Sequence, residues 1–250
     1  MSHLRSHRLP LFVGVLVLIV LLFHGPIVQP TNYHDFADDR RWLGIDHAAD
    51  VLSNLGFLLL GAWGIHHLRR TGQAEQAGDL ACRLFCVALL LTGLGSIWYH
   101  LAPDNQRLIW DRLPIAFACA MLLAATLGRR LDVAGSRLLT SLLTLLAVAT
   151  VVWWRLSDDL RPYLLLQLTP LWLIPLWLWQ QRAPAAEQAT FGAAVLLYVA
   201  AKLVEVYDHA LFESLKVVSG HTLKHLIATI AAALIVRQAV RAHRQRHVSA

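Results

Sequence analysis

The stretch Leu80–Leu101, LACRLFCVALLLTGLGSIWYHL, is apolar over most of its length, and its only Lys, Arg, Asp or Glu is Arg83. A helix of this length spans the roughly 30 Å hydrocarbon core of a bilayer, at about 1.5 Å per residue. Near its end, Ser96 and His100 stand four residues apart, which places them on one helix face. The stretch therefore predicts a membrane-spanning helix with a polar face at one end.

Apolar runs of similar character recur along the chain. The eight predicted runs are Leu9–Val28, Asp50–Leu68, Leu80–Leu101, Leu113–Leu127, Leu138–Trp154, Pro162–Trp179, Ala189–Tyr207 and Ser219–Val240. Of the 250 residues, 57% are hydrophobic and 15% are charged, whereas soluble domains average roughly 45–50% and 25%. We expect an all-α membrane protein with short connections and no separate soluble domain.

The first apolar run follows Arg5 and Arg8, as the apolar region of a secretory signal peptide would. The run is longer than such a region, and Gly25–Pro30 offers no small-x-small cleavage site. We therefore expect an uncleaved N-terminal anchor helix over residues 1–30. A helical domain over 31–240 and a basic tail over 241–250 complete the predicted organisation.

The formal charge of +6 is distributed unevenly between the connecting segments. If the N-terminus is cytoplasmic, then Arg69–Arg70, Arg129–Arg130 and the tail Arg237–His247 share its side, as the positive-inside rule requires. The acidic residues of the opposite segments are Asp35, Asp38, Asp39, Asp46, Asp104, Asp158, Asp159 and Glu213. We expect both termini in the cytoplasm and interpret the positive charge as a topology signal, not as a nucleic-acid surface.

The last run begins with Ser219-Gly220-His221-Thr222-Leu223-Lys224-His225. His221 and His225 are four residues apart, the spacing that lets two imidazoles of one helix reach one zinc ion. The predicted topology puts His100 at the same depth on the same side, and three protein ligands leave one zinc position open, as in catalytic sites. Hydrogen-bonded core histidines remain the alternative. Residues 222–224 contain no Glu, so the usual zinc-protease motif is absent.

Other polar residues within or beside the runs have milder explanations. Lys202 and Glu205 are three apart and can pair along one helix, and Glu205 can also pair with Lys224 across helices. Asp208 and His209 are candidate partners of the histidines. Three residues at the start of the second run are expected to hydrogen-bond into the bundle: Asp50, Ser53 and Asn54.

Three elements in order, Ser96-Ile97-Trp98-Tyr99-His100, Asp111 and the pair His221 and His225, resemble the alkaline ceramidases. This family belongs to a superfamily that includes adiponectin-type receptors. Its bacterial branch is also similar at Tyr99–Asn105 and Trp110–Pro114, and the resemblance extends from about Tyr33 to Val240. It implies a seven-transmembrane-helix bundle of alkaline ceramidase type plus one extra N-terminal transmembrane helix. The calcium motif of the animal enzymes, Asp-Trp-x-Glu-x-Asn, is absent, so no calcium ligands are assigned.

The resemblance implies a zinc-dependent membrane amidase that hydrolyses the N-acyl amide bond of a ceramide-like lipid. His100, His221 and His225 would hold Zn²⁺, Asp111 would take the proton of the attacking water, and Ser96 would stabilise the oxyanion. A bacterial inner membrane is the implied location, with the active site on the periplasmic side. A non-catalytic zinc-containing receptor or scaffold is the alternative. A transporter is disfavoured because the polar groups gather at one depth. The sequence does not identify protein partners.

Overall fold

The computed structural model describes residues 8–69 and 75–248. Its helices are α2 (Arg8–His24), α3 (Ala48–Ser53), α4 (Leu55–His67), α5 (Asp79–His100), α6 (Asn105–Gly128), α7 (Val133–Ser157), α8 (Arg161–Gln180), α9 (Ala185–Val206), α10 (Asp208–Leu215) and α11 (Gly220–Val248). The described part of the chain contains no strand beyond an isolated bridge between Trp42 and Ile45. The all-α prediction is confirmed. Arg5, Arg70 and the last two tail residues lie outside the described residues.

Seven helical segments of the described chain are long and apolar enough to cross a membrane, with α3 and α4 counted as one span over Ala48–His67. This confirms the predicted seven-helix membrane bundle. α2 is apolar but has only 17 residues, or about 26 Å of helix against a hydrocarbon core of roughly 30 Å. The transmembrane role of the segment over residues 1–30 therefore stays a prediction.

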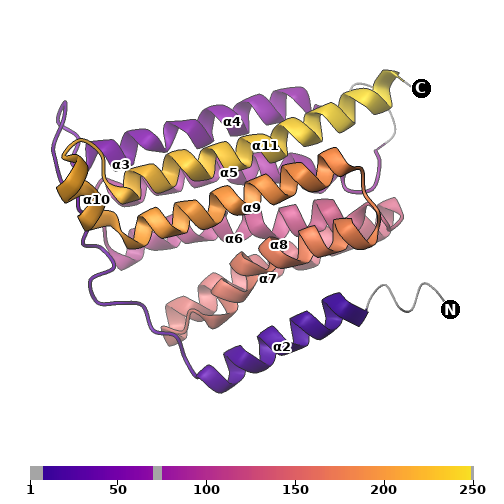
Figure 1. The fold of residues 1–250 in the computed structure, drawn as a ribbon, viewed down its shortest axis with the longest axis horizontal. Helices are drawn as coiled ribbons and strands as arrows, with labels where there is room; N and C mark the ends of the chain where they lie inside the picture. Colours follow the sequence, from indigo (N-terminus) through magenta and orange to yellow (C-terminus); the bar gives the residue numbers. More distant parts are fainter. Residues whose placement is uncertain (1–7, 70–74, 249–250) are drawn as a thin grey trace.

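Six helices, α4, α5, α6, α8, α9 and α11, contribute residues to one internal cavity. α7 packs against α6 and α8, and α2 lies at the edge of the bundle beside α8 (Figure 1). α5 ends where α11 begins, next to α10, and we call this end of the bundle the histidine end. The start of α2 and the end of α11 both lie at the opposite end (Figure 1).

Polar contacts fix the segment after α2 to the turn between α7 and α8. The backbone N–H of Ile27 donates to Asp159 Oδ1 at 3.2 Å, and that of Leu160 donates to the Ile27 carbonyl at 2.8 Å. Hydrogen bonds from Arg161 lower the pKa of Asp159, so this carboxylate stays ionised. α2 is thus held to the bundle at its C-terminal end.

Two glycines allow backbones to meet closely beside the histidines. A Cβ on Gly95 would lie 1.9 Å from the carbonyl oxygen of Trp110, so α5 and α6 touch there. A Cβ on Gly220 would lie 2.0 Å from the carbonyl oxygen of Val204, so α11 begins against the end of α9. Only glycine fits such contacts, and each precedes a residue of the predicted site.

The main departure from the sequence-based boundaries is α6, which begins at Asn105 and not at Leu113. The Asp104 side chain accepts hydrogen bonds from the N–H groups of Gln106 and Arg107, which caps the helix two turns earlier than hydropathy indicates. The second difference is α10, a short helix with polar residues that the apolar runs did not predict.

Candidate active site

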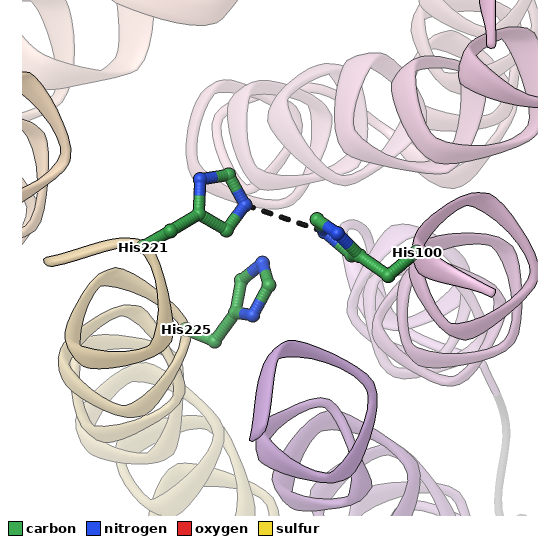
Figure 2. Close-up of side chains that lie close together, drawn as sticks. All are labelled: His100, His221 and His225. Carbon is green, nitrogen blue, oxygen red and sulfur yellow. Dashed lines mark hydrogen bonds between the residues drawn. The ribbon is translucent and has the colours of Figure 1, made fainter. Parts of the chain in front are cut away.

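Three histidines meet at the histidine end, His100 from the last turn of α5 and His221 and His225 from the first turns of α11 (Figure 2). All three are buried, and one ring nitrogen of each lies within 4.8 Å of the others. The two Nε2 atoms of His100 and His221 are 3.3 Å apart. Such a group of imidazoles is able to hold a metal ion.

The spacing of two of the imidazoles, those of His100 and His221, fits tetrahedral coordination. Zinc–nitrogen bonds of about 2.0–2.1 Å at tetrahedral angles put two ligand nitrogens about 3.3–3.4 Å apart. The Nε2 atoms of His100 and His221 stand at 3.3 Å. The three rings also stand at steep angles to one another, with centroids 4.8–5.1 Å apart. One nitrogen of each ring lies within 4.8 Å of the others, close enough for the three to approach one ion.

Hydrogen bonds to the far side of His225 leave its Nε2 free. Ser53 Oγ donates its only hydrogen to the Asp50 carbonyl at 2.9 Å, and the same oxygen lies 2.8 Å from His225 Nδ1. In the tautomer with the proton on Nδ1, this nitrogen donates to Ser53 Oγ, and Asn54 Nδ2 lies 3.2 Å from it. The lone pair of the imidazole is then on Nε2, as metal-ligating histidines require.

Lys224 lies between the two α11 histidines in sequence. Its ammonium group approaches the His221 ring away from the direction of the Nε2 lone pair. Its Nζ is 2.9 Å from His221 Nε2 and 3.5 Å from Nδ1. A donor placed along the Nε2 lone pair would lie about 5 Å from Nδ1. The ammonium group therefore does not block that lone pair, and His221 Nε2 remains able to bind a metal.

Asp208 joins the first turn of α11 to the loop before α3. One carboxylate oxygen accepts from the N–H of His221 at 2.6 Å, and the other accepts from the N–H of Ala37 at 2.9 Å. A carboxylate at a helix N-terminus is also favoured by the helix dipole. Asp208 thereby holds the backbone of a histidine and the loop above it in one arrangement.

The loop before α3 covers the histidines. The ring of Phe36 lies 4.8 Å from that of His100 and 4.4 Å from that of His221. Arg40 pairs with buried Asp38 and donates to the Val217 carbonyl at 2.7 Å, which ties the loop to the segment before α11. Burial favours a higher pKa for Asp38, but the hydrogen bonds from Arg40 outweigh it and lower that pKa.

An apolar cavity of about 200 Å³ extends from this site into the bundle. Ser96, Asp111 and His225 line its polar end, and Ile235, ten residues beyond His225, lines it farther along α11. Ser96 lies beside Asp111, and its Oγ is buried without a partner of normal hydrogen-bond geometry among the described residues. Polar side chains, among them a hydroxyl, a carboxylate and an imidazole, therefore line a cavity whose surface is mostly apolar.

A family model described as Ceramidase matches residues 47–248, which include all three histidines, Ser96 and Asp111. The chain belongs to the Ceramidase family. Membership assigns it to the ceramidase-type amide hydrolases and agrees with an apolar substrate and with embedding in a membrane. No curated protein matches the chain. The match begins at residue 47, after the loop that carries Phe36. The contacts of this loop with the histidines are therefore known only from the structure.

Within this Ceramidase family member, the structure brings all five predicted site residues to one end of the bundle. The predicted Lys202–Glu205–Lys224 pairing is present, and Ser53 and Asp208 hydrogen-bond to the α11 histidines. Sequence reasoning assigned no role to Phe36, since an aromatic residue in a loop carries no signal of a contact with helices far along the chain. It also did not foresee that Lys224 lines the cavity.

Proposed function

We propose that the protein is a zinc-dependent membrane amidase that hydrolyses the N-acyl amide bond of a ceramide-like lipid. The observation that carries this proposal is the grouping of three buried imidazoles, one of which, that of His225, lines a mostly apolar cavity. His100, His221 and His225 would hold the ion. Zinc bound there would supply a Lewis acid that polarises the amide carbonyl and lowers the pKa of a water molecule towards 7.

The side chains that line the cavity supply the remaining chemistry. The acyl chain lies along the apolar length of the cavity, which brings the amide to Ser96 and Asp111. Asp111 takes a proton from the attacking water and delivers it to the leaving amine nitrogen. Ser96 donates its hydroxyl hydrogen to the carbonyl oxygen as negative charge develops there. Water adds to the carbonyl carbon, the C–N bond breaks, and a fatty acid and a long-chain amine leave.

We further propose that both termini face the cytoplasm of a bacterium and that the site opens towards the periplasmic side of the inner membrane. Two features support this orientation: the bias of Lys and Arg towards one set of connections, and the common end of the bundle at which α2 begins and α11 ends. The histidine end then lies level with the outer lipid headgroups, where the amide of a ceramide-like lipid resides. Residues 1–30 are proposed as an anchor and 241–250 as a cytoplasmic tail.

The test is to incubate detergent-purified protein with a panel of N-acyl lipids and to detect released fatty acid by mass spectrometry. We expect release by the wild type and none by His221→Ala, which should also lose bound zinc. His66→Ala, at the other end of α4 and exposed, is the matched control and should keep both. No release from any lipid by zinc-loaded wild type would contradict the proposal and favour a receptor or scaffold.

A further inference from the structure

Lys224 is a charged residue within a membrane-spanning helix that the proposed reaction leaves without a role. Its side chain is 19% exposed, and its Nζ donates to Glu205 Oε1 at 2.9 Å. The other carboxylate oxygen, Oε2, accepts from Lys202 Nζ at 2.7 Å. Ionisable groups at membrane depth are costly, and for that reason they commonly mark a functional site.

The charges of the Lys202, Glu205 and Lys224 side chains do not balance among themselves. Glu205 carries one negative charge and binds two ammonium groups. Lys202 alone would satisfy it from the same helix, three residues away and with a 44% exposed side chain. Lys224 is the more buried of the two lysines, so it brings an additional positive charge into the protein where a simple ion pair would not need one.

The position of the Lys224 ammonium group points to where this charge acts. Lys224 lines the same cavity as Ser96, Asp111 and His225. Its Nζ stands 2.9 Å from His221 Nε2 but to the side of the lone pair, as described above. Among the described residues, no ion pair within 4.0 Å joins Lys224 to Asp111. The ammonium group is therefore next to the metal-binding nitrogens, and it interacts electrostatically with the Asp111 carboxylate without a direct ion pair.

We propose that Lys224 is a further catalytic residue, whose ammonium group stabilises the negative charge on the amide carbonyl oxygen in the transition state. This inference rests on the proposed function. When the water oxygen bonds to the carbonyl carbon, the carbonyl π pair moves onto oxygen, where Lys224 and Ser96 face it. The electrons return as the C–N bond breaks, and Asp111 passes its proton to nitrogen. Lys224 keeps its three protons throughout, and Glu205 is a positioning residue that aims it.

A fixed cation in a dry site acts mainly on the state in which charge develops, so its removal should lower kcat more than it raises KM. The variants are Lys224→Met, which keeps the length of the side chain without its charge, and Lys224→Arg, which keeps the charge. Lys216→Met is the matched control, because Lys216 is exposed and lies outside the spans. With N-dodecanoyl-sphingosine as substrate, we expect Lys224→Met to lower kcat about 10²- to 10³-fold. Lys224→Arg should recover part of this loss, and the control should match the wild type.

Two readouts separate this role from a structural one. Zinc per chain, measured by plasma mass spectrometry, should be the same in Lys224→Met and in the wild type. The second readout needs no turnover: the Kd of a dodecylphosphonate monoester, a tetrahedral anion, should rise at least about tenfold in Lys224→Met. The Kd of N-dodecyl acetamide, a neutral amide, should stay unchanged.

The outcomes distinguish the two proposals. If the wild type releases fatty acid but Lys224→Met keeps its kcat, the catalytic role of Lys224 is wrong and the proposed function stands. If Lys224→Met loses its zinc, or if it binds both the phosphonate and the amide less tightly, the residue has a structural role. Either result would also overturn the inference. If Lys224→Met does not fold, Lys224→Gln takes its place in the same measurements. No release by the wild type from any N-acyl lipid contradicts the proposed function itself.

Discussion

Two carboxylates in this molecule each bind two basic side chains, at opposite ends of the bundle. Glu205 near the histidine end pairs with Lys202 and Lys224. Glu75, before the start of α5, pairs with Arg83 and Arg137. The charge pattern is the same in both clusters.

The surroundings of the two clusters differ. Glu75 is 7% exposed but its partner Arg137, on α7, is 55% exposed, and together with Arg83 the carboxylate joins α5 to α7. Lys224 instead faces an apolar cavity and the ring of His221. We therefore propose that one pattern of charges stabilises the fold at one end and serves the proposed reaction at the other. Variants at the histidine end should therefore change turnover, whereas variants of Glu75 should change stability.

The largest effect is expected for Asp111→Asn. An amide cannot take a proton from water, so kcat should fall about 10²- to 10⁴-fold while zinc is retained. Fatty acid release and zinc per chain measure the two quantities. Asp46→Asn, an exposed substitution in the loop before α3, should change neither. Undiminished turnover in Asp111→Asn would show that another group is the base.

A smaller effect at the same end is expected for Ser53→Ala. The loss of the acceptor for His225 Nδ1 should weaken zinc binding about 10- to 100-fold, because such partners orient metal-ligating histidines. Competition with a chelator of known affinity measures this change. Ser157→Ala, at the exposed end of α7, is the control. An unchanged zinc affinity would mean that Ser53 does not orient the ring.

At the opposite end, Glu75→Gln should leave kcat unchanged and lower the free energy of unfolding by about 0.5–1 kcal/mol, as expected for partly exposed ion pairs. Thermal melting in detergent and an activity assay check the two parts. If Glu75→Gln lost turnover but kept its full stability, the proposed difference in role between the two clusters would be wrong.

The smallest effect is the pH dependence of that stability difference. Hydrogen bonds from Arg137, and then from Arg83, lower the pKa of Glu75 in the folded protein below its usual 4.5. A lowered folded-state pKa means that the carboxylate stabilises the fold at pH values above 4.5 and ceases to do so as the pH falls through the folded pKa. The melting temperatures of wild type and Glu75→Gln should therefore converge in acid. A gap that widens in acid would contradict the sign.

Much of the site could be predicted from sequence because helical spacing is local. Four-residue intervals put Ser96 beneath His100 and His221 beside His225, and hydropathy fixed which helix ends share a side of the membrane. Contacts that depend on loops were not predictable in this way. Phe36 reaches the histidines through a loop with no period.

Two further features needed three-dimensional information. α6 starts early because Asp104 caps it, and capping is weak beside hydropathy as a guide to membrane helices. Lys224 was recognised as an ion-pair partner of Glu205, but spacing alone does not tell that it also lines the cavity. The helices were thus predictable from local pattern, whereas the direction of individual side chains was not.

The central claim is that hydrolysis depends on a metal held by His100, His221 and His225. The most direct measurement is fatty acid release from N-dodecanoyl-sphingosine after chelation and again after zinc is restored. The account predicts that the wild type loses release when its zinc is removed and regains it with added Zn²⁺, whereas His225→Ala shows none in either state. Full release by metal-free wild type, or zinc-restored release by His225→Ala equal to that of the wild type, would contradict it.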